Sequence, residues 1–179
     1  MSQSTRVDIL RFQFDLTWSL FELHLDRLTP TSLLWEPAPV CWNMRMDRDG
    51  EWIPDWDESD SDPIPAPTIG WLTWHIGWWW TTALSHACGR SPLDRTEIRW
   101  PGDLAAVIVW LRDLRTAWLD VLDHYDDEDL DAPASFPWVD DPEKTVGHTA
   151  AWLNVELVKN VAEIGQLRLL WAASIPRHQ

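Results

Sequence analysis

The feature that most constrains the fold of this chain is a stretch without proline near the C-terminus. Between positions 143 and 171 the sequence holds no proline, and apolar residues recur at helical spacing. They are Val146, Ala150, Leu153, Leu157, Val161, Ile164 and Trp171. Residues spaced in this way share one side of an α-helix, so the sequence predicts one long amphipathic helix over 143–171.

Three more segments carry a helical pattern. We predict helices over 5–28, 68–87 and 102–123. The second is apolar almost all round, which is typical of a helix buried on most sides. The first and third each have one apolar stripe that we expect to face the core. The stripe of the first is Ile9, Phe12, Leu16, Leu20 and Leu23, and that of the third is Leu104, Val107, Ile108, Leu111, Leu114, Trp118 and Leu122.

Prolines and tryptophans dominate the connection between the first and second predicted helices. Seven of the 13 prolines lie between positions 30 and 67, which excludes a long helix there. A short hairpin over 44–52, turning at Asp49 and Gly50, fits the pattern. The acidic segment 55–62 lacks the regular spacing of a calcium-binding loop, so we interpret it as solvated. Whether this segment is ordered or acts as a lid stays open.

These elements together predict the fold class. The sequence has no internal repeat and no strand-rich region, and four helices joined by two long connections are typical of a helical bundle. We therefore expect an all-α protein, an antiparallel four-helix bundle that forms a single domain over 1–179. The long proline- and tryptophan-rich connection would lie between the first two helices.

The charge of the chain restricts its partners. It has 29 acidic and 14 basic residues, for a formal net charge of −15. Nucleic acids and anionic membranes need a positive surface, so neither is an expected partner. No signal peptide and no 18-residue apolar run is present, and Cys41 and Cys88 suggest no disulfide framework. The expectation is a soluble cytoplasmic protein.

A polar row beside the apolar stripe of the last helix is the candidate functional site. Glu156, Asn160 and Glu163 follow the spacing i, i+4, i+7 and lie at the edge of the apolar face. A carboxylate there is partly desolvated, which is costly unless it is paired or bound. On the second predicted helix, His75 lies among tryptophans of a chain that has 16 of them, which favours an aromatic-walled pocket. The nearest by spacing are Trp71, Trp78 and Trp79.

The chain resembles a known family at these positions. The segment 68–75, which reads Thr-Ile-Gly-Trp-Leu-Thr-Trp-His, and the segment 163–166, Glu-Ile-Gly-Gln, look like the DinB superfamily, as does Glu156. The likeness extends over nearly the whole chain and is strongest to a subgroup whose last helix reads like 154–165. It implies a DinB-like four-helix bundle that is commonly a homodimer.

The resemblance also implies a metal site that this chain lacks in its standard form. Many DinB proteins bind a divalent metal through one histidine on the second helix and an HxxxH pair before a Gly-Gln on the last. His75 matches the first ligand. The two positions of the pair hold Lys159 and Glu163, and a protonated lysine has no lone pair for a metal. The tri-histidine site is therefore absent.

Three hypotheses about function follow, and whether the protein is an enzyme stays open. The first is small-molecule binding in a tryptophan-lined pocket, with His75, Glu156 and Glu163 as acid–base groups. Asn160, Lys159, Trp71, Trp78 and Trp79 would contact the molecule. The second is a metalloenzyme, a divalent-metal-dependent hydrolase or low-molecular-weight-thiol transferase, that uses the three acid–base residues as remodelled ligands. Competition from Lys159 disfavours that metal. The third is a non-catalytic bundle with a structural polar core.

Overall fold

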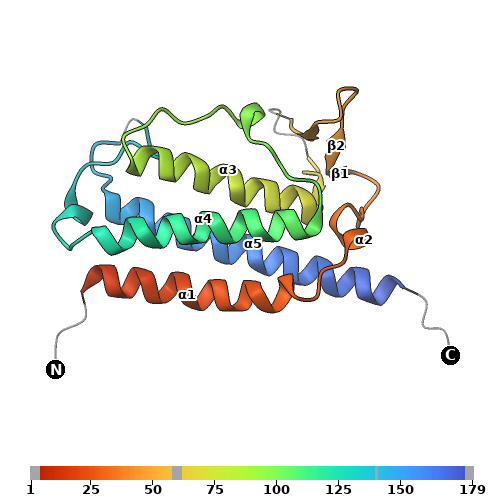
Figure 1. Cartoon of the computed structure of the whole chain (residues 1–179), viewed down its shortest axis with the longest axis horizontal. Coiled ribbons are helices and arrows are strands. Elements are labelled where there is room, and N and C mark those ends of the chain that lie inside the picture. The colour runs from red at the N-terminus through yellow and green to blue at the C-terminus, as the bar shows by residue number, and fades with distance from the viewer. Residues whose placement is uncertain (1–4, 58–61, 140, 176–179) are drawn as a thin grey trace.

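The computed structural model describes residues 5–57, 62–139 and 141–175. Four long helices lie side by side and enclose one hydrophobic core (Figure 1). They are α1 (Arg6–Leu25), α3 (Ile69–Ala87), α4 (Leu104–His124) and α5 (Val146–Ser174). Each end lies within three residues of the predicted boundary. The prediction of a mainly helical, DinB-like fold is confirmed.

The directions of the helices differ in part from the expected antiparallel order. Figure 1 shows α1 and α5 running one way and α3 and α4 the other. The connection from α3 to α4 runs back along the length of the bundle and contains the short helix η1 (Arg95–Glu97). The neighbours α3 and α4 are therefore parallel, because a long connection allows a crossover that a tight turn does not.

The remaining elements are short and lie at the two ends of the bundle. Two two-stranded sheets form in the connection between α1 and α3, where β1 pairs with β4 in parallel and β2 pairs with β3 antiparallel. The antiparallel pair lies where the short hairpin was predicted, whereas the parallel pair was not predicted. These elements are α2 (Pro30–Leu33), β1 (Cys41–Trp42), β2 (Met44–Met46), β3 (Trp52–Pro54), β4 (Ala66–Pro67) and η2 (Asp129–Asp131).

The β2–β3 hairpin confirms the turn read from the sequence. Gly50 has φ +82°, a left-handed conformation that glycine adopts without strain. The carboxylate of Asp47 accepts hydrogen bonds from the backbone N–H groups of Asp49 and Glu51. From the acidic segment 55–62, residues 58–61 lie outside the described residues. Asp55 is ordered, and its carboxylate pairs with Arg45 at 3.0 Å.

The stripes predicted for α4 and α5 face the core as expected. Leu111 and Leu122 on α4 and Leu157 and Ile164 on α5 are at most 1% exposed. Close approach of α3 and α4 depends on Gly77, since a Cβ there would lie 1.8 Å from a ring carbon of Trp110. Among the described residues, no helix combines the length and the apolar character that crossing a membrane requires.

The stripe predicted for α1 is wrong in its direction. Ile9, Phe12, Leu16, Leu20 and Leu23 are between 46% and 66% exposed. A different apolar set faces the core, namely Phe14, Trp18, Phe21 and Leu25. The helix carries apolar residues on two faces, and periodicity alone does not say which face the rest of the bundle covers. The buried face is the one with the larger aromatic rings, and two of these, Phe14 and Trp18, pack on Trp80 of α3.

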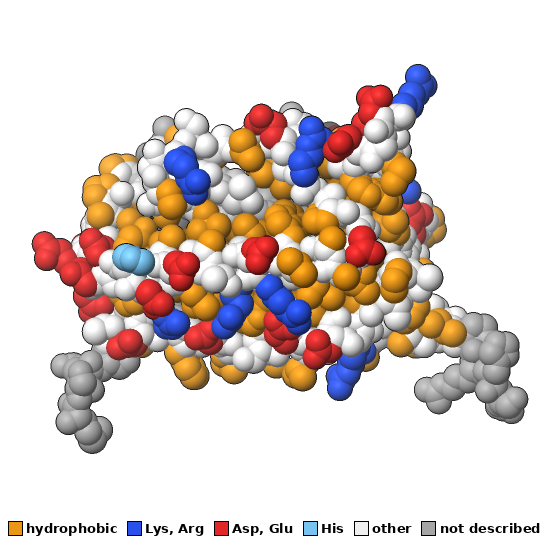
Figure 2. All heavy atoms as spheres, in the orientation of Figure 1, with side chains coloured by type: hydrophobic (Ala, Val, Ile, Leu, Met, Phe, Trp, Pro, Cys, Tyr) orange, Lys and Arg blue, Asp and Glu red, His pale blue; other side chains and the backbone are white. Residues whose placement is uncertain are grey.

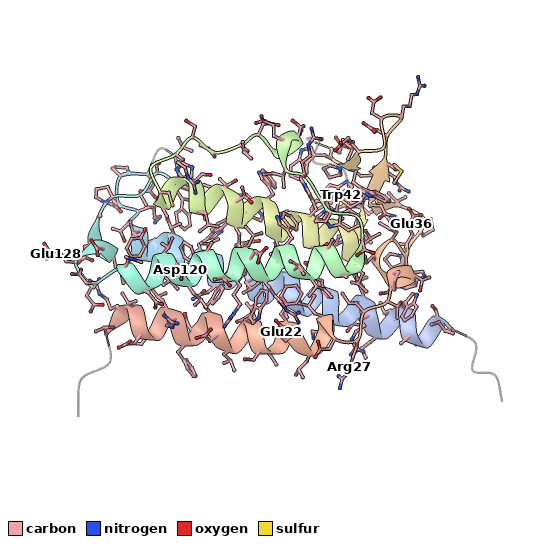
Figure 3. The ribbon with its side chains drawn as sticks, viewed as in Figure 1. Glu22, Arg27, Glu36, Trp42, Asp120 and Glu128 are labelled. Carbon is pink, nitrogen blue, oxygen red and sulfur yellow. The ribbon has the colours of Figure 1, made fainter. Side chains whose placement is uncertain are left out.

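Ion pairs fix the side of α1 that faces α4. Arg112 of α4 binds Glu22 through two hydrogen bonds, and Arg115 binds Asp15 at 3.1 Å. Figure 3 shows Glu22 on the α4 side of α1. On the α5 side, the amide of Asn154 donates to the backbone oxygen of Leu10 at 3.0 Å. These contacts set the rotation of α1 and leave its second apolar face outward.

Candidate functional site

His75 is held in the middle of α3 by hydrogen bonds to both ring nitrogens. It is 8% exposed, and Trp71 stacks on its ring at 4.9 Å between centroids. The indole N–H of Trp79, one turn along α3, donates to Nε2 of His75 at 2.5 Å. An indole nitrogen is a donor only, so Nε2 carries no proton and a neutral imidazole must carry its proton on Nδ1.

Asn160 of α5 meets that second nitrogen across the bundle. The two side chains are 3.4 Å apart, with the amide nitrogen of Asn160 placed beside Nδ1. Asn160 is 1% exposed, and its amide oxygen has no partner in the described part of the chain. Because Nδ1 carries the proton, hydrogen-bond chemistry assigns the oxygen to the His75 side, with the amide turned by 180°.

The surroundings keep His75 uncharged. Burial, and next the positive charge of Lys159, lowers the pKa of His75 to about 3, although the bond to Asn160 opposes this shift. A buried imidazole loses hydration when it gains a proton, which is why burial favours the neutral form. A base with so low a pKa is weak near neutral pH, so the geometry does not favour the predicted role of His75 as general base.

The two carboxylates lie beside this pair without joining it. Glu156 forms an ion pair with Lys159 at 2.8 Å, and Glu163 is half-buried. Burial raises the pKa of Glu163, Lys159 acts against that shift and Glu156 adds to it. Glu163 forms no hydrogen bond or ion pair with any described residue. The structure thus brings His75 to Asn160 and Trp79, and it does not bring either carboxylate into hydrogen-bond contact with His75.

These residues do not fit the metal site of the resemblance. Within 5–57, 62–139 and 141–175, no three His, Cys, Asp or Glu side chains are grouped so that they could hold a metal ion. The lone pair of His75 Nε2 already accepts the Trp79 N–H. A protonated Lys159 has no lone pair to offer a metal, so these residues do not form the metal site that the resemblance implies.

A band of tryptophans, which sequence reasoning missed as a continuous feature, crosses α3 and α5. Six half-buried indoles touch in series, with neighbouring ring centroids between 4.6 and 6.3 Å apart. In order they are Trp42, Trp56, Trp78, Trp79, Trp152 and Trp138, and we name them the tryptophan band. The spacing of Trp78 and Trp79 placed them near His75. Nothing in the sequence showed that loop residues extend the row at both ends.

One loop of the tryptophan band is bonded to α3, and cations of the chain lie over rings in both outer parts of the band. The indole N–H of Trp71 donates to the backbone oxygen of Asp55 at 2.8 Å, which anchors the segment that carries Trp56. The guanidinium of Arg95 lies over the Trp56 ring at 5.0 Å from its centroid. At the other end, the ammonium of Lys144 lies 5.6 Å from the ring centre of Trp138.

Two hollows of the surface lie away from the predicted site residues. A cavity of about 480 Å³ opens between the N-terminal ends of α1 and α5, and one of about 230 Å³ lies near Trp118 and Tyr125. Neither is lined by His75, Glu156, Glu163 or another predicted site residue. The predicted tryptophan-walled pocket is therefore an open band of rings rather than one of these cavities.

Comparison with known protein families assigns the chain to a family. The family model described as the DinB superfamily matches residues 13–164. The chain belongs to the DinB superfamily. The match covers α3, α4 and most of α1 and α5, so it includes every predicted site residue of this DinB chain. A search of the curated proteins gave no match. Family membership thus fixes the fold and leaves the ligand to be argued from the residues.

Proposed function

We propose that this DinB-like protein binds a small organic cation on the tryptophan band, beside Glu163. The observations that carry the proposal are a half-buried carboxyl without a hydrogen-bond or ion-pair partner among the described residues and a row of half-buried indoles that crosses the helix facing it. The face of an indole attracts a cation through its quadrupole, and a nearby carboxylate adds charge attraction. This site needs neither a metal nor a catalytic histidine.

The chain's own cations support the choice of a cationic ligand. Arg95 and Lys144 lie over Trp56 and Trp138, the outer parts of the tryptophan band. The central rings, Trp78 and Trp79, have no Lys or Arg over them in the described part of the chain. The centre thus offers the same ring chemistry without an internal partner, and the net charge of −15 favours the approach of cations.

The two carboxylates of α5 lie on opposite sides of the level of His75. Because α5 runs antiparallel to α3 and Asn160 meets His75, Glu163 lies one turn towards the level of Trp71. Glu156 lies one turn the other way, towards Trp79, and is already paired with Lys159. Glu163 is therefore the carboxylate left to pair with a ligand, and a bound cation would lower its raised pKa.

The test is a fluorescence titration with choline and with 3,3-dimethylbutan-1-ol, its neutral analogue of the same shape. Choline should change the tryptophan emission saturably, and the alcohol should bind about two- to thirtyfold more weakly, since one cation–π contact is worth about 0.5–2 kcal/mol. Glu163→Gln should weaken choline binding. Glu128→Gln, at the far end of the bundle in Figure 3, is the control. Equal binding of the two compounds, or no response to either, would refute the proposal.

A second reading, a structural polar core without ligand, has one observation in its favour. Both nitrogens of His75 are satisfied inside the protein, by Trp79 and by Asn160. On this reading His75→Gln lowers stability, and no compound of the choline type changes the fluorescence. The hydrolase or thiol-transferase alternative with remodelled metal ligands draws no support from the described residues.

A further inference from the structure

The cavity of about 230 Å³ lies at the end of the bundle where α3 and α4 finish and α5 begins, and we name it the end cavity (Figure 1). Its wall includes His86 of α3, Trp118 and Tyr125 of α4, and the loop 133–136. His75 lies about three turns back along α3 from His86 and does not line it. The end cavity is therefore separate from the site at His75. The space-filling view in Figure 2 shows how acidic side chains crowd the outer surface at this end of the bundle.

The loop that forms one side of the end cavity is bonded to the start of α5. The backbone N–H of Ala134 donates to the backbone oxygen of Lys144 at 3.0 Å. The hydroxyl of Thr149 donates to the backbone oxygen of Phe136 at 2.5 Å. These bonds fix the wall from within the chain. A preformed cavity loses less conformational entropy when a molecule enters it, which favours binding.

The wall of the end cavity is rich in aromatic rings, and none of the described residues that line it is Asp, Glu, Lys or Arg. The rings of His86 and Phe136 stack with 5.0 Å between centroids and an angle of 14° between planes. Tyr125 adds another ring, and burial raises the pKa of its hydroxyl, which therefore stays protonated. Aromatic walls favour an aromatic ligand. A charged ligand would lose hydration in this cavity without gaining an ion-pair partner.

Trp118 brings a buried hydrogen-bond donor without an acceptor to this wall. Its side chain is 3% exposed, and no atom of the described residues accepts its indole N–H. Buried polar groups in proteins nearly always have a hydrogen-bond partner, and an indole nitrogen can only donate. The end cavity is a hollow that Trp118 borders, so an acceptor atom of a molecule inside it would supply the partner that the chain does not.

We propose that the end cavity binds a neutral molecule with one aromatic ring and a carbonyl oxygen. The ring lies against Phe136, and the oxygen accepts the indole N–H of Trp118. The volume fits this class of molecule. An apolar cavity of about 150 Å³ holds benzene, and drug-sized ligands occupy pockets of about 300 Å³ or more. At about 230 Å³, the end cavity has room for one ring with a small substituent.

Phe136 lies between the end cavity and the tryptophan band in the chain of ring contacts. Its centroid is 5.0 Å from that of His86, 5.9 Å from that of Trp79 and 5.4 Å from that of Trp152. The cavity and the band adjoin at this ring, but neither Glu163 nor any indole of the band lines the cavity. This inference therefore does not depend on the cation proposed for the band.

Nuclear magnetic resonance of the indole N–H groups tests the site, because Trp118→Phe identifies the Trp118 resonance by its loss. Acetophenone is the probe and should move this resonance saturably. α-Methylstyrene has the same shape with a methylene carbon in place of the carbonyl oxygen. It should bind about two- to twelvefold more weakly, which is the effect of one net hydrogen bond. In Trp118→Phe, titrated through the signals of the ligand, the two compounds should bind equally.

Ala134→Leu tests the location, because the larger side chain fills part of the end cavity from its loop. It should abolish the shift of the Trp118 resonance, with unchanged circular dichroism. Ala38→Leu is the matched control, since Ala38 is also half-buried in a loop, between α2 and β1 at the other end of the bundle (Figure 1). It should bind acetophenone as the wild type does. Four results would overturn the proposal: no shift with acetophenone, equal affinity of the wild type for the two compounds, unchanged binding by Ala134→Leu, or a saturable shift confined to Trp79 and Trp152.

Discussion

Lowering the pH from 7 to 5 should destabilise the folded protein through His75. Its folded pKa of about 3 lies below the ordinary value of 6.5, because the ring is buried and Lys159 is near. Between these two values the unfolded chain binds a proton at this position and the folded chain does not. Stability therefore falls as the pH falls through this window, and the contribution of His75 is fully present only above about 6.5.

The size of the effect follows from the two pKa values. With 6.5 unfolded and about 3 folded, His75 should account for a loss of about 2 kcal/mol in the free energy of unfolding at pH 5. Further loss follows at about 1.4 kcal/mol per pH unit down to the folded pKa. The side chain is only 8% exposed, so solvent screening reduces this value little.

Urea unfolding followed by far-ultraviolet circular dichroism at pH 7.5, 6.5, 5.5 and 5.0 measures the effect. The wild-type free energy of unfolding should fall across the series, and His75→Gln should remove about 2 kcal/mol of that fall while lowering stability at pH 7.5. The pKa of His24 is also lowered, by burial and by Arg168 and Arg27, so the difference between the two proteins isolates His75. The exposed His124→Gln is the control. A His75→Gln slope equal to the wild-type slope would refute the reasoning.

Three further changes test other contacts. Gly77→Ala should destabilise by about 1–2 kcal/mol in urea unfolding, because overpacking against Trp110 exceeds the ~1 kcal/mol gain in helix propensity, and a more stable variant would contradict this packing. Glu163→Gln should raise the stability at pH 7 slightly, because burial raises the pKa of this carboxyl, and urea unfolding should show that gain lost as the pH falls through the raised pKa. Lys159→His with Glu163→His should still bind zinc weakly in calorimetry, because Nε2 of His75 is engaged, and tight 1:1 binding would refute that.

The sequence predicted α3, α4 and α5 well because the apolar residues of each helix can be buried in only one way. The stripes of α4 and α5 are their main apolar faces, and α3 is apolar almost all round, so any packing buries it. The ends were readable from local chemistry. Thr68 accepts a hydrogen bond from the backbone N–H of Trp71, and the carboxylate of Asp103 accepts two at the start of α4.

The sequence failed at α1 because two faces of that helix are apolar. Both Leu16 and Trp18 fit a helical stripe, and only the contacts of the folded chain distinguish them. Trp18 packs on Trp80 and is 4% exposed, whereas Leu16 is 54% exposed. Periodicity therefore offered two faces of α1 and could not say which of them the core covers.

The candidate site was predicted as a set of residues but not as a set of bonds. Asn160 and Glu163 lie only about 60° apart around α5, yet Asn160 is 1% exposed and Glu163 is half-buried. Because of this 60° difference, the amide of Asn160 meets His75 and the carboxylate of Glu163 does not. Helical spacing identifies the face of a helix only to within about 60°. It therefore predicted the polar row of α5 but could not say which residue of that row contacts His75.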